Sequence, residues 1–256
     1  MAARYAPTIA RFTLLEAVRN RLVWVALAIV AAGLGLAAFL HQVAITESRQ
    51  IEAAVLAAFL RFAGVFLVVA FVVTSMVREF SDKVLEVVLS HPVSRSSYLF
   101  GKFAGFSTAA FGLAAMFTAP LFLFAPPAPT LAWGFSLALE LLVMTAVSLF
   151  CVLSLTNVVA ALSAAAAFYI LSRSMGAAQI IAAASAQSAT WSDRVANGLL
   201  EMVAKLLPSL DQMTRTDWLV VAGPDWQTLA SVAAQAGVYI ALIVAASLFD
   251  FYRQNF

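Results

Sequence analysis

The sequence predicts an all-α polytopic membrane protein with six transmembrane helices. Of its 256 residues, 63% are hydrophobic and 11% are charged, whereas soluble domains average about 45–50% apolar and about 25% charged residues. The apolar residues also gather in runs of about 20, the length that a helix needs to cross a bilayer. Because backbone polar groups cannot be left open in lipid, we interpret these runs as helices.

Six runs reach this length. They cover about residues 22–44, 59–77, 99–124, 131–155, 158–181 and 229–249. Pro120 and three further prolines within 126–129 end the third run, while Thr156 and Asn157 alone separate the fourth run from the fifth. We therefore expect a very tight turn between the fourth and fifth helices.

The residues before the first span predict an N-terminal interfacial helix. Phe12, Leu15 and Leu22 share one face, on which Arg11 and Arg19 also lie. Arginine side chains can extend their charged groups to lipid headgroups, so a helix at the membrane surface fits this pattern. No small-residue cleavage site follows a short apolar core here, and we expect no cleaved signal peptide.

The distribution of Lys and Arg predicts the orientation, because loops rich in them stay in the cytoplasm. An even number of spans places both termini on one side. That side holds nine basic residues, namely Arg4, Arg11, Arg19, Arg21, Arg78, Lys83, Arg95, Lys102 and Arg253, against four on the other, namely Arg49, Arg194, Lys205 and Arg215. We therefore expect both termini to be cytoplasmic. Trp191, Trp218 and Trp226 fall on the outer side, where tryptophan favours the membrane interface.

A charge-rich segment, residues 78–97, separates the second span from the third. It predicts a cytoplasmic helix over 78–89, because Val84, Leu85, Val88 and Leu89 share one face and Pro92 stops the helix. The helix could rest on lipid headgroups, but its acidic residues suit an anionic surface poorly, which favours a docked partner. The candidate partner-binding residues are Arg78, Glu79, Asp82, Lys83, Leu85, Glu86 and Leu89.

The outer loop, residues 182–228, also predicts helical structure before the last span. Ser192 and Asp193 can cap a helix, and Pro208 ends it. One face would carry Val195, Leu199, Met202, Val203 and Leu206. This helix would lie in the outer membrane interface, either as a connector or as a gate.

Three ionisable residues lie at or inside the spans, away from their cytoplasmic ends: Arg61, Glu140 and Arg173. Insertion of a lone charge costs about 2.5–3.5 kcal/mol, and pairing is the usual remedy. Glu140 and Arg173 lie at similar depths, roughly 13 Å from the outer ends of consecutive helices at about 1.5 Å per residue. We expect the three residues to lie near one another, either as a structural ion pair that fixes helix register or as a polar site on a transport route.

The sequence lacks the common catalytic and nucleotide-binding motifs. The sequence contains no G-x-x-x-x-G-K-[ST] phosphate loop, no H-E-x-x-H and no G-x-S-x-G, and Cys151 is the only cysteine. His41 and His91 fall on opposite sides of the membrane by the expected topology. We therefore predict no catalytic residue, no metal site and no cofactor in this chain. The formal net charge of +2 gives no reason to expect nucleic acid as a partner.

The segment between the second and third spans resembles that of a known family. The strings REF at 78–80, VLEVVLS at 84–90, PVSR at 92–95 and YLFGK at 98–102 look like the permeases of ABC-2 type ABC transporters, and the expected layout of helices is similar. The strings at 9–17, 207–211 and 249–256 resemble a subgroup linked to maturation of multicopper enzymes, including nitrous oxide reductase.

The resemblance implies a homodimer in the bacterial inner membrane, with two copies of a separate ATPase subunit that would hold ATP and Mg²⁺. The helix over 78–89 would be the coupling helix that docks the ATPase. In this family the first and fifth spans tend to form the dimer contact, and the alanine-rich stretch 160–167 permits close packing there or within one subunit.

These observations predict the permease subunit of an ATP-driven exporter, without enzymatic activity of its own and surrounded by membrane lipid. The alternative function is a non-transporting scaffold or sensor that recruits a cytoplasmic partner. Lipid, glycan, peptide, drug and a sulfur or metal species all stay open as cargo.

Overall fold

The computed structural model describes residues 6–43, 48–82, 94–155, 157–185, 198, 202, 207–220 and 223–253. The elements are α1 (Ala6–Arg19), α2 (Leu22–Val43), α3 (Ser48–Ser81), α5 (Arg95–Thr118), η2 (Ala119–Leu123), α6 (Pro127–Leu155), α7 (Val158–Ser185), η4 (Leu210–Gln212), α9 (Asp217–Val220) and α10 (Trp226–Arg253), where η marks a 3-10 helix. Among the described residues, six helices are long and apolar enough to cross a membrane. The predicted all-α membrane fold is confirmed.

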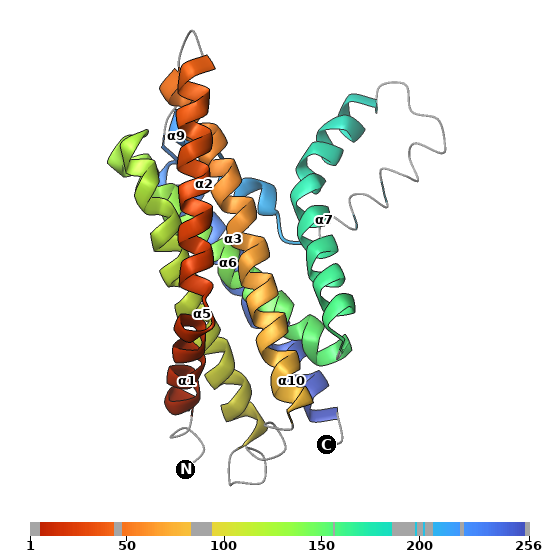
Figure 1. Cartoon of the computed structure of the whole chain (residues 1–256). Coiled ribbons are helices and arrows are strands. Elements are labelled where there is room, and N and C mark those ends of the chain that lie inside the picture. The colour runs from red at the N-terminus through yellow and green to blue at the C-terminus, as the bar shows by residue number, and fades with distance from the viewer. Residues whose placement is uncertain are drawn as a thin grey trace.

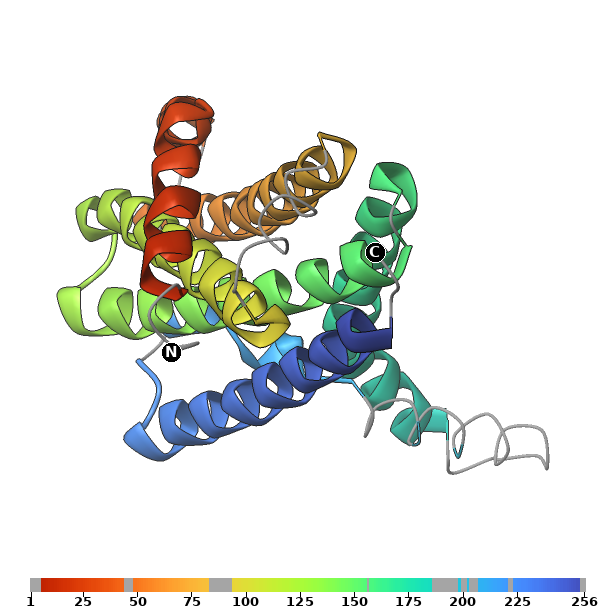
Figure 2. The same ribbon diagram turned by 90° about the horizontal axis from the view of Figure 1, so that it is seen from below.

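Helix α6 forms the centre of the bundle. Figure 2 shows α3 and α5 on one side of α6 and α10 on the other, and 83% of the most apolar stretch of α6 is buried. The same share is 17% for α2 and α10 and 28% for α7, so these helices turn most of their apolar surface outward. Both termini lie at one end of the bundle, here called the termini end, and α9 lies towards the distal end (Figure 1).

Some helices extend beyond the predicted spans. Helix α3 has 34 residues and begins at Ser48, eleven residues before the predicted span. The prediction followed the apolar run and therefore left out the polar first turns of this helix. Glu52 in these turns is buried, and its Oε1 lies 2.8 Å from Nδ1 of His41 on α2. Helix α5 ends at Thr118 and continues as η2, where Pro120 occupies one of the first positions, since proline cannot continue the α-helical hydrogen bonding.

Two predicted helices fall mostly outside the described residues. The cytoplasmic helix over 78–89 is described only as far as Asp82, and the outer helix around 192–206 only at Gly198 and Met202. Both helices stay predictions.

Helix α1 packs directly on α5 through two glycines one helical turn apart. A Cβ atom at Gly101 would lie 2.9 Å from the Ala6 carbonyl oxygen, and one at Gly105 would lie 2.6 Å from Thr13 Cβ. Small residues at this spacing let helix backbones approach closely in membranes. The two glycines therefore fix the N-terminal helix against the start of the third span.

We predict that Gly105→Ala destabilises the fold, because its methyl group would overlap the Cβ atom of Thr13 on α1. Overpacking of this kind costs about 1–3 kcal/mol. The control is Gly112→Ala on the same helix, where an added Cβ meets no atom within 4 Å and where alanine favours the helix. Thermal unfolding in mild detergent should show a lower midpoint for Gly105→Ala only. Equal midpoints for both variants would contradict direct packing of α1 on α5.

Candidate functional site

Residues 207–220, here called the inserted segment, fold into the bundle rather than onto its surface. Leu210, Met213 and Thr214 are each 0% exposed, and the segment packs against α3, α6 and α7. Trp218 is only 6% exposed, so its predicted place in an interfacial belt is wrong, whereas Trp226 is exposed. The chain therefore places irregular backbone inside a bundle of membrane-spanning helices.

Two arginines hydrogen-bond this irregular backbone. Arg173 Nη1 on α7 donates to the carbonyl oxygens of Leu210 at 2.7 Å and Met213 at 3.0 Å, and Arg61 Nη1 on α3 donates to that of Thr214 at 2.9 Å. Non-helical backbone at membrane depth is tolerated only where the protein or water satisfies its polar groups. The arginines provide that satisfaction from two different helices.

Helix α6 completes the site with a carboxylate and a hydroxyl one turn apart. Glu140 is 0% exposed; it accepts a hydrogen bond from the Thr214 hydroxyl, and its Oε1 lies 3.4 Å from Arg173 Nη1. Ser136 Oγ accepts from the Thr214 backbone N–H at 2.9 Å. Thr214 has φ 47°, the left-handed region that is uncommon for residues other than glycine.

We call Arg61, Ser136, Glu140, Arg173 and Thr214 the polar cluster. Two guanidinium groups face one carboxylate, so backbone carbonyl oxygens compensate the remaining positive charge. Arg61 Nε is buried without a hydrogen-bond partner among the described residues. A buried network that is only partly satisfied is costly, which makes the cluster a suitable place for a rearrangement.

A second set of contacts surrounds the segment that links α3 to α5, at the termini end. Glu79, near the end of α3, accepts a hydrogen bond from the Tyr98 hydroxyl at 2.5 Å and forms an ion pair with Lys102; both partners lie on α5. Ser75, one turn before Glu79, donates a hydrogen bond to Glu16 of α1 at 2.9 Å. Arg78 forms an ion pair with the same Glu16 carboxylate. The last turn of α3 is therefore held by both α1 and α5.

The start of α5 is held as firmly. Ser94 caps it by accepting from the Ser97 N–H at 3.2 Å, and Arg95 Nη1 donates to the Phe251 carbonyl oxygen on α10 at 2.9 Å. The Tyr98 and Phe251 rings stack with centroids 6.0 Å apart. Residues 83–93 thus connect two helix ends that are fixed to the rest of the bundle.

A family model described as ABC-2 family transporter protein matches residues 25–208 of this chain. The chain belongs to the ABC-2 transporter family. It has the character of a permease-type membrane subunit, and an ABC-type ATPase is the general partner of this family. The match gives no support to the narrower subgroup linked to multicopper enzyme maturation. No curated protein matches the chain.

The predicted site residues of this ABC-2 chain lie in two regions of the structure. Arg61, Glu140 and Arg173, expected near one another, all contact Thr214, and Glu140 and Arg173 form the expected ion pair. Of the predicted partner-binding residues, Arg78 and Glu79 contact other helices of the chain, while Asp82 is exposed. Lys83, Leu85, Glu86 and Leu89 lie outside the described residues.

Sequence reasoning missed Ser136 and Thr214. Ser136 carried a signal, because a polar residue four positions before Glu140 lies on the same face of a helix. No feature of the sequence pointed to Thr214, since a threonine in a polar loop indicates neither burial nor a left-handed backbone conformation. No group of three His, Cys, Asp or Glu residues suited to a metal occurs in the described part of the chain.

We predict that Glu140→Gln destabilises the protein, because it leaves the buried guanidinium group of Arg61 and the half-buried one of Arg173 without a counter-charge. Removal of one partner of a buried pair costs about 3–5 kcal/mol. The variant with the reversed pair, Glu140→Arg with Arg173→Glu, should also be less stable than the wild type. The carbonyl oxygens of Leu210 and Met213 would then face a carboxylate instead of a guanidinium group. Thermal unfolding in detergent measures both effects.

The control is Arg215→Gln at the exposed pair with Asp217, whose side chains are 53% and 67% exposed. Exposed pairs contribute about 0–1 kcal/mol, so this variant should unfold like the wild type. Full recovery by the reversed pair would show that the two side chains act alone, without the inserted segment.

Proposed function

We propose that the chain is the transmembrane permease subunit of an ATP-driven exporter and that a separate ATPase docks at the termini end on residues 78–97. The observation that best supports docking on these residues is the contact of Glu79 with Tyr98 and Lys102. It joins the helices before and after this segment, so a force on the segment would act on the bundle instead of on a loose loop. Family membership supports the ATPase as the docked partner.

The termini end is proposed to face the cytoplasm of a bacterial cell. The excess of Lys and Arg favours this side, and the two termini and the facing ends of α3 and α5 lie at this same end (Figure 1). An ATPase that uses cytoplasmic ATP and Mg²⁺ would therefore reach residues 78–97 directly.

The functional unit is proposed to contain two copies of this chain and two ATPase subunits. Helices α2 and α7 are the first and fifth spans, and only 17% and 28% of their most apolar stretches are buried within one copy. Their outward faces suit the dimer contact that the family resemblance implies, since Ala160 and Ala167 of α7 are exposed and small residues allow close helix approach.

The inserted segment is proposed to close the outer end of the transport route. It joins α3, α6 and α7 through the polar cluster, and these helices would have to separate there for cargo to pass. A scaffold or sensor that recruits a cytoplasmic partner would also use residues 78–97, but it would have no need for a charged, buried closure at the opposite end. The polar cluster therefore favours transport over the scaffold.

We predict that Asp82→Lys combined with Glu86→Lys releases the ATPase. Asp82 is exposed and Glu86 is one of the predicted partner-binding residues, whereas Glu79 supports the fold and would confound the test. The measurement is the amount of ATPase that co-purifies with the chain from native membranes in mild detergent, together with ATP hydrolysis by the complex.

The control is Asp217→Lys with Asp225→Lys, which makes the same change in charge at exposed positions of the distal end. Both double variants should keep the thermal stability of the wild type, and only the first should lose the ATPase. A wild-type yield of ATPase from the first variant would refute docking on this segment, and a co-purified partner without ATPase activity would favour the scaffold.

A further inference from the structure

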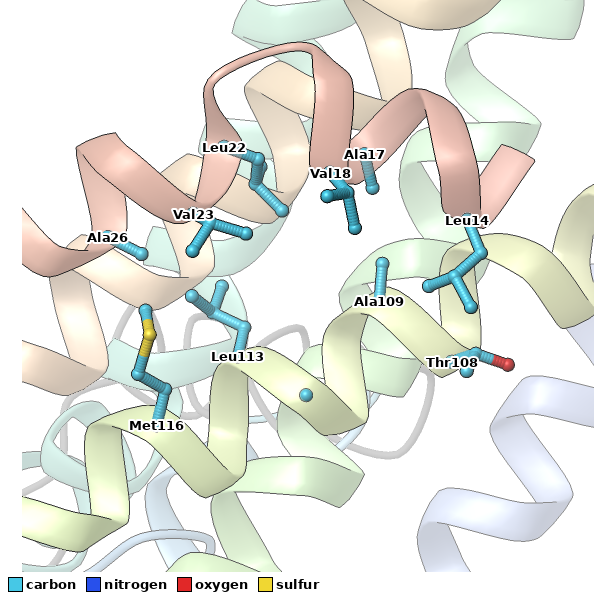
Figure 3. Close-up of a pocket in the computed structure, with 11 residues that line it drawn as sticks. Leu14, Ala17, Val18, Leu22, Val23, Ala26, Thr108, Ala109, Leu113 and Met116 are labelled. Carbon is cyan, nitrogen blue, oxygen red and sulfur yellow. The ribbon is translucent and has the colours of Figure 1, made fainter. Parts of the chain in front are cut away.

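An apolar groove lies where the turn between α1 and α2 faces α5. Its volume is about 190 Å³. Figure 3 shows Leu14 and Val18 of α1 and Val23 of α2 on one side, with Leu113 and Met116 of α5 opposite. We call this the elbow groove. None of its lining residues belongs to the polar cluster or to residues 78–97.

The lining of the elbow groove excludes a polar ligand. Thr108 is the one lining residue with a polar side chain, and its hydroxyl already donates to the Ala104 carbonyl oxygen at 2.8 Å. Apolar cavities of this kind stay free of water and accept apolar guests. The groove is therefore suited to hydrocarbon.

Two arginines lie at the turn between α1 and α2, next in sequence to residues that line the groove. Arg19 and Arg21 flank the lining residues Val18 and Leu22 in sequence, directly before the first apolar span. Both are exposed, and neither has an ion-pair partner in the described part of the chain, unlike Arg78, which pairs with Glu16. Arginines beside the start of a span lie at the level of lipid headgroups.

The backbone at this point is built as a sharp turn. Arg21 has φ 58°, a conformation that is uncommon for a non-glycine residue, and its carbonyl oxygen accepts from the Val25 N–H at 2.9 Å as α2 begins. The left-handed residue ends α1 and redirects the chain into α2. The turn therefore brings the two arginines and the groove together.

We propose that the elbow groove binds one acyl chain of an anionic phospholipid whose headgroup contacts Arg19 and Arg21. An apolar groove beside two exposed arginines that have no ion-pair partner among the described residues matches the two parts of such a lipid. A zwitterionic lipid offers the same chain but no net negative charge. In the proposed orientation this lipid belongs to the cytoplasmic leaflet, although binding itself does not depend on the proposed function.

Gly112 provides a direct test of the chain-binding part. It lines the groove, and a Cβ atom added there meets nothing within 4 Å, so Gly112→Leu is suited to place a side chain in the groove. Gly237→Leu on α10 is the matched control, because Gly237 is also exposed and open. Arg19→Gln with Arg21→Asn tests the headgroup part, since asparagine tolerates the left-handed conformation.

Native mass spectrometry of the purified chain, titrated with phosphatidylglycerol or with phosphatidylcholine of the same chains, measures binding. We expect tighter binding of phosphatidylglycerol. Gly112→Leu should weaken it about tenfold, as expected when about two methylene groups lose their site. The arginine double variant should weaken it about 30-fold and leave phosphatidylcholine unchanged. Gly237→Leu should match the wild type.

Several results would overturn the proposal. Wild-type affinity of Gly112→Leu would show that no chain enters the groove, and wild-type affinity of the arginine variant would show that no headgroup binds there. Equal affinity of the two lipids would remove the anionic requirement. A change in dimer fraction by Gly112→Leu, with lipid binding unaltered, would assign the groove to a second copy of the chain.

Discussion

The structure depends on how the protein satisfies irregular backbone inside a membrane-spanning bundle. The carbonyl oxygens of Leu210, Met213 and Thr214 lie where water cannot reach them freely, and the guanidinium groups of Arg173 and Arg61 supply their hydrogen bonds. Glu140 in turn faces both guanidinium groups, of which that of Arg61 is buried and that of Arg173 is half-buried. Since the three ionised residues come from α3, α6 and α7, the inserted segment cannot move without disturbing three helices. Helix α7 buries little of its own apolar surface, and these contacts add to its direct packing against α3 and α6.

Helix α3 connects this site to the opposite end of the molecule. Arg61 and Glu79 lie on the same helix of 34 residues, with Arg61 in the polar cluster and Glu79 bound to α5 beside the proposed docking segment. A rigid helix with contacts at both ends is the simplest mechanical link between the proposed cytoplasmic partner and the proposed outer closure. Helix α6 offers a parallel link, because Ser154 donates to Asp250 of α10 at 2.7 Å while Glu140 lies in the cluster.

The features that the sequence could predict are those set by helix length and by the cost of charge in lipid. Apolar runs located all six spans, and the depth of Glu140 and Arg173 predicted their pairing. The inserted segment could not be predicted, because residues 207–220 have the polar, proline-containing composition of a surface loop and their burial depends on partners far away in sequence. The buried Trp218 shows the same limit, since a tryptophan near a span fits the membrane interface and a protein interior equally. Gly101 and Gly105 were visible as small residues at helical spacing, but nothing in the sequence showed that α1 was the helix they admit.

We propose that the inserted segment must leave its place for transport, and an engineered disulfide provides the test. A Cβ atom at Gly176 of α7 would lie 3.2 Å from Asp211 Cβ, close to the roughly 3.5–4.5 Å of disulfides, so Gly176→Cys with Asp211→Cys in a Cys151→Ala background can lock the segment to α7. The measurement is ATP hydrolysis by the complex with its ATPase, before and after reduction of one sample. We predict slow hydrolysis by the oxidised complex and recovery on reduction, with no such change in either single-cysteine variant. Hydrolysis at the same rate in the oxidised and reduced states would contradict it.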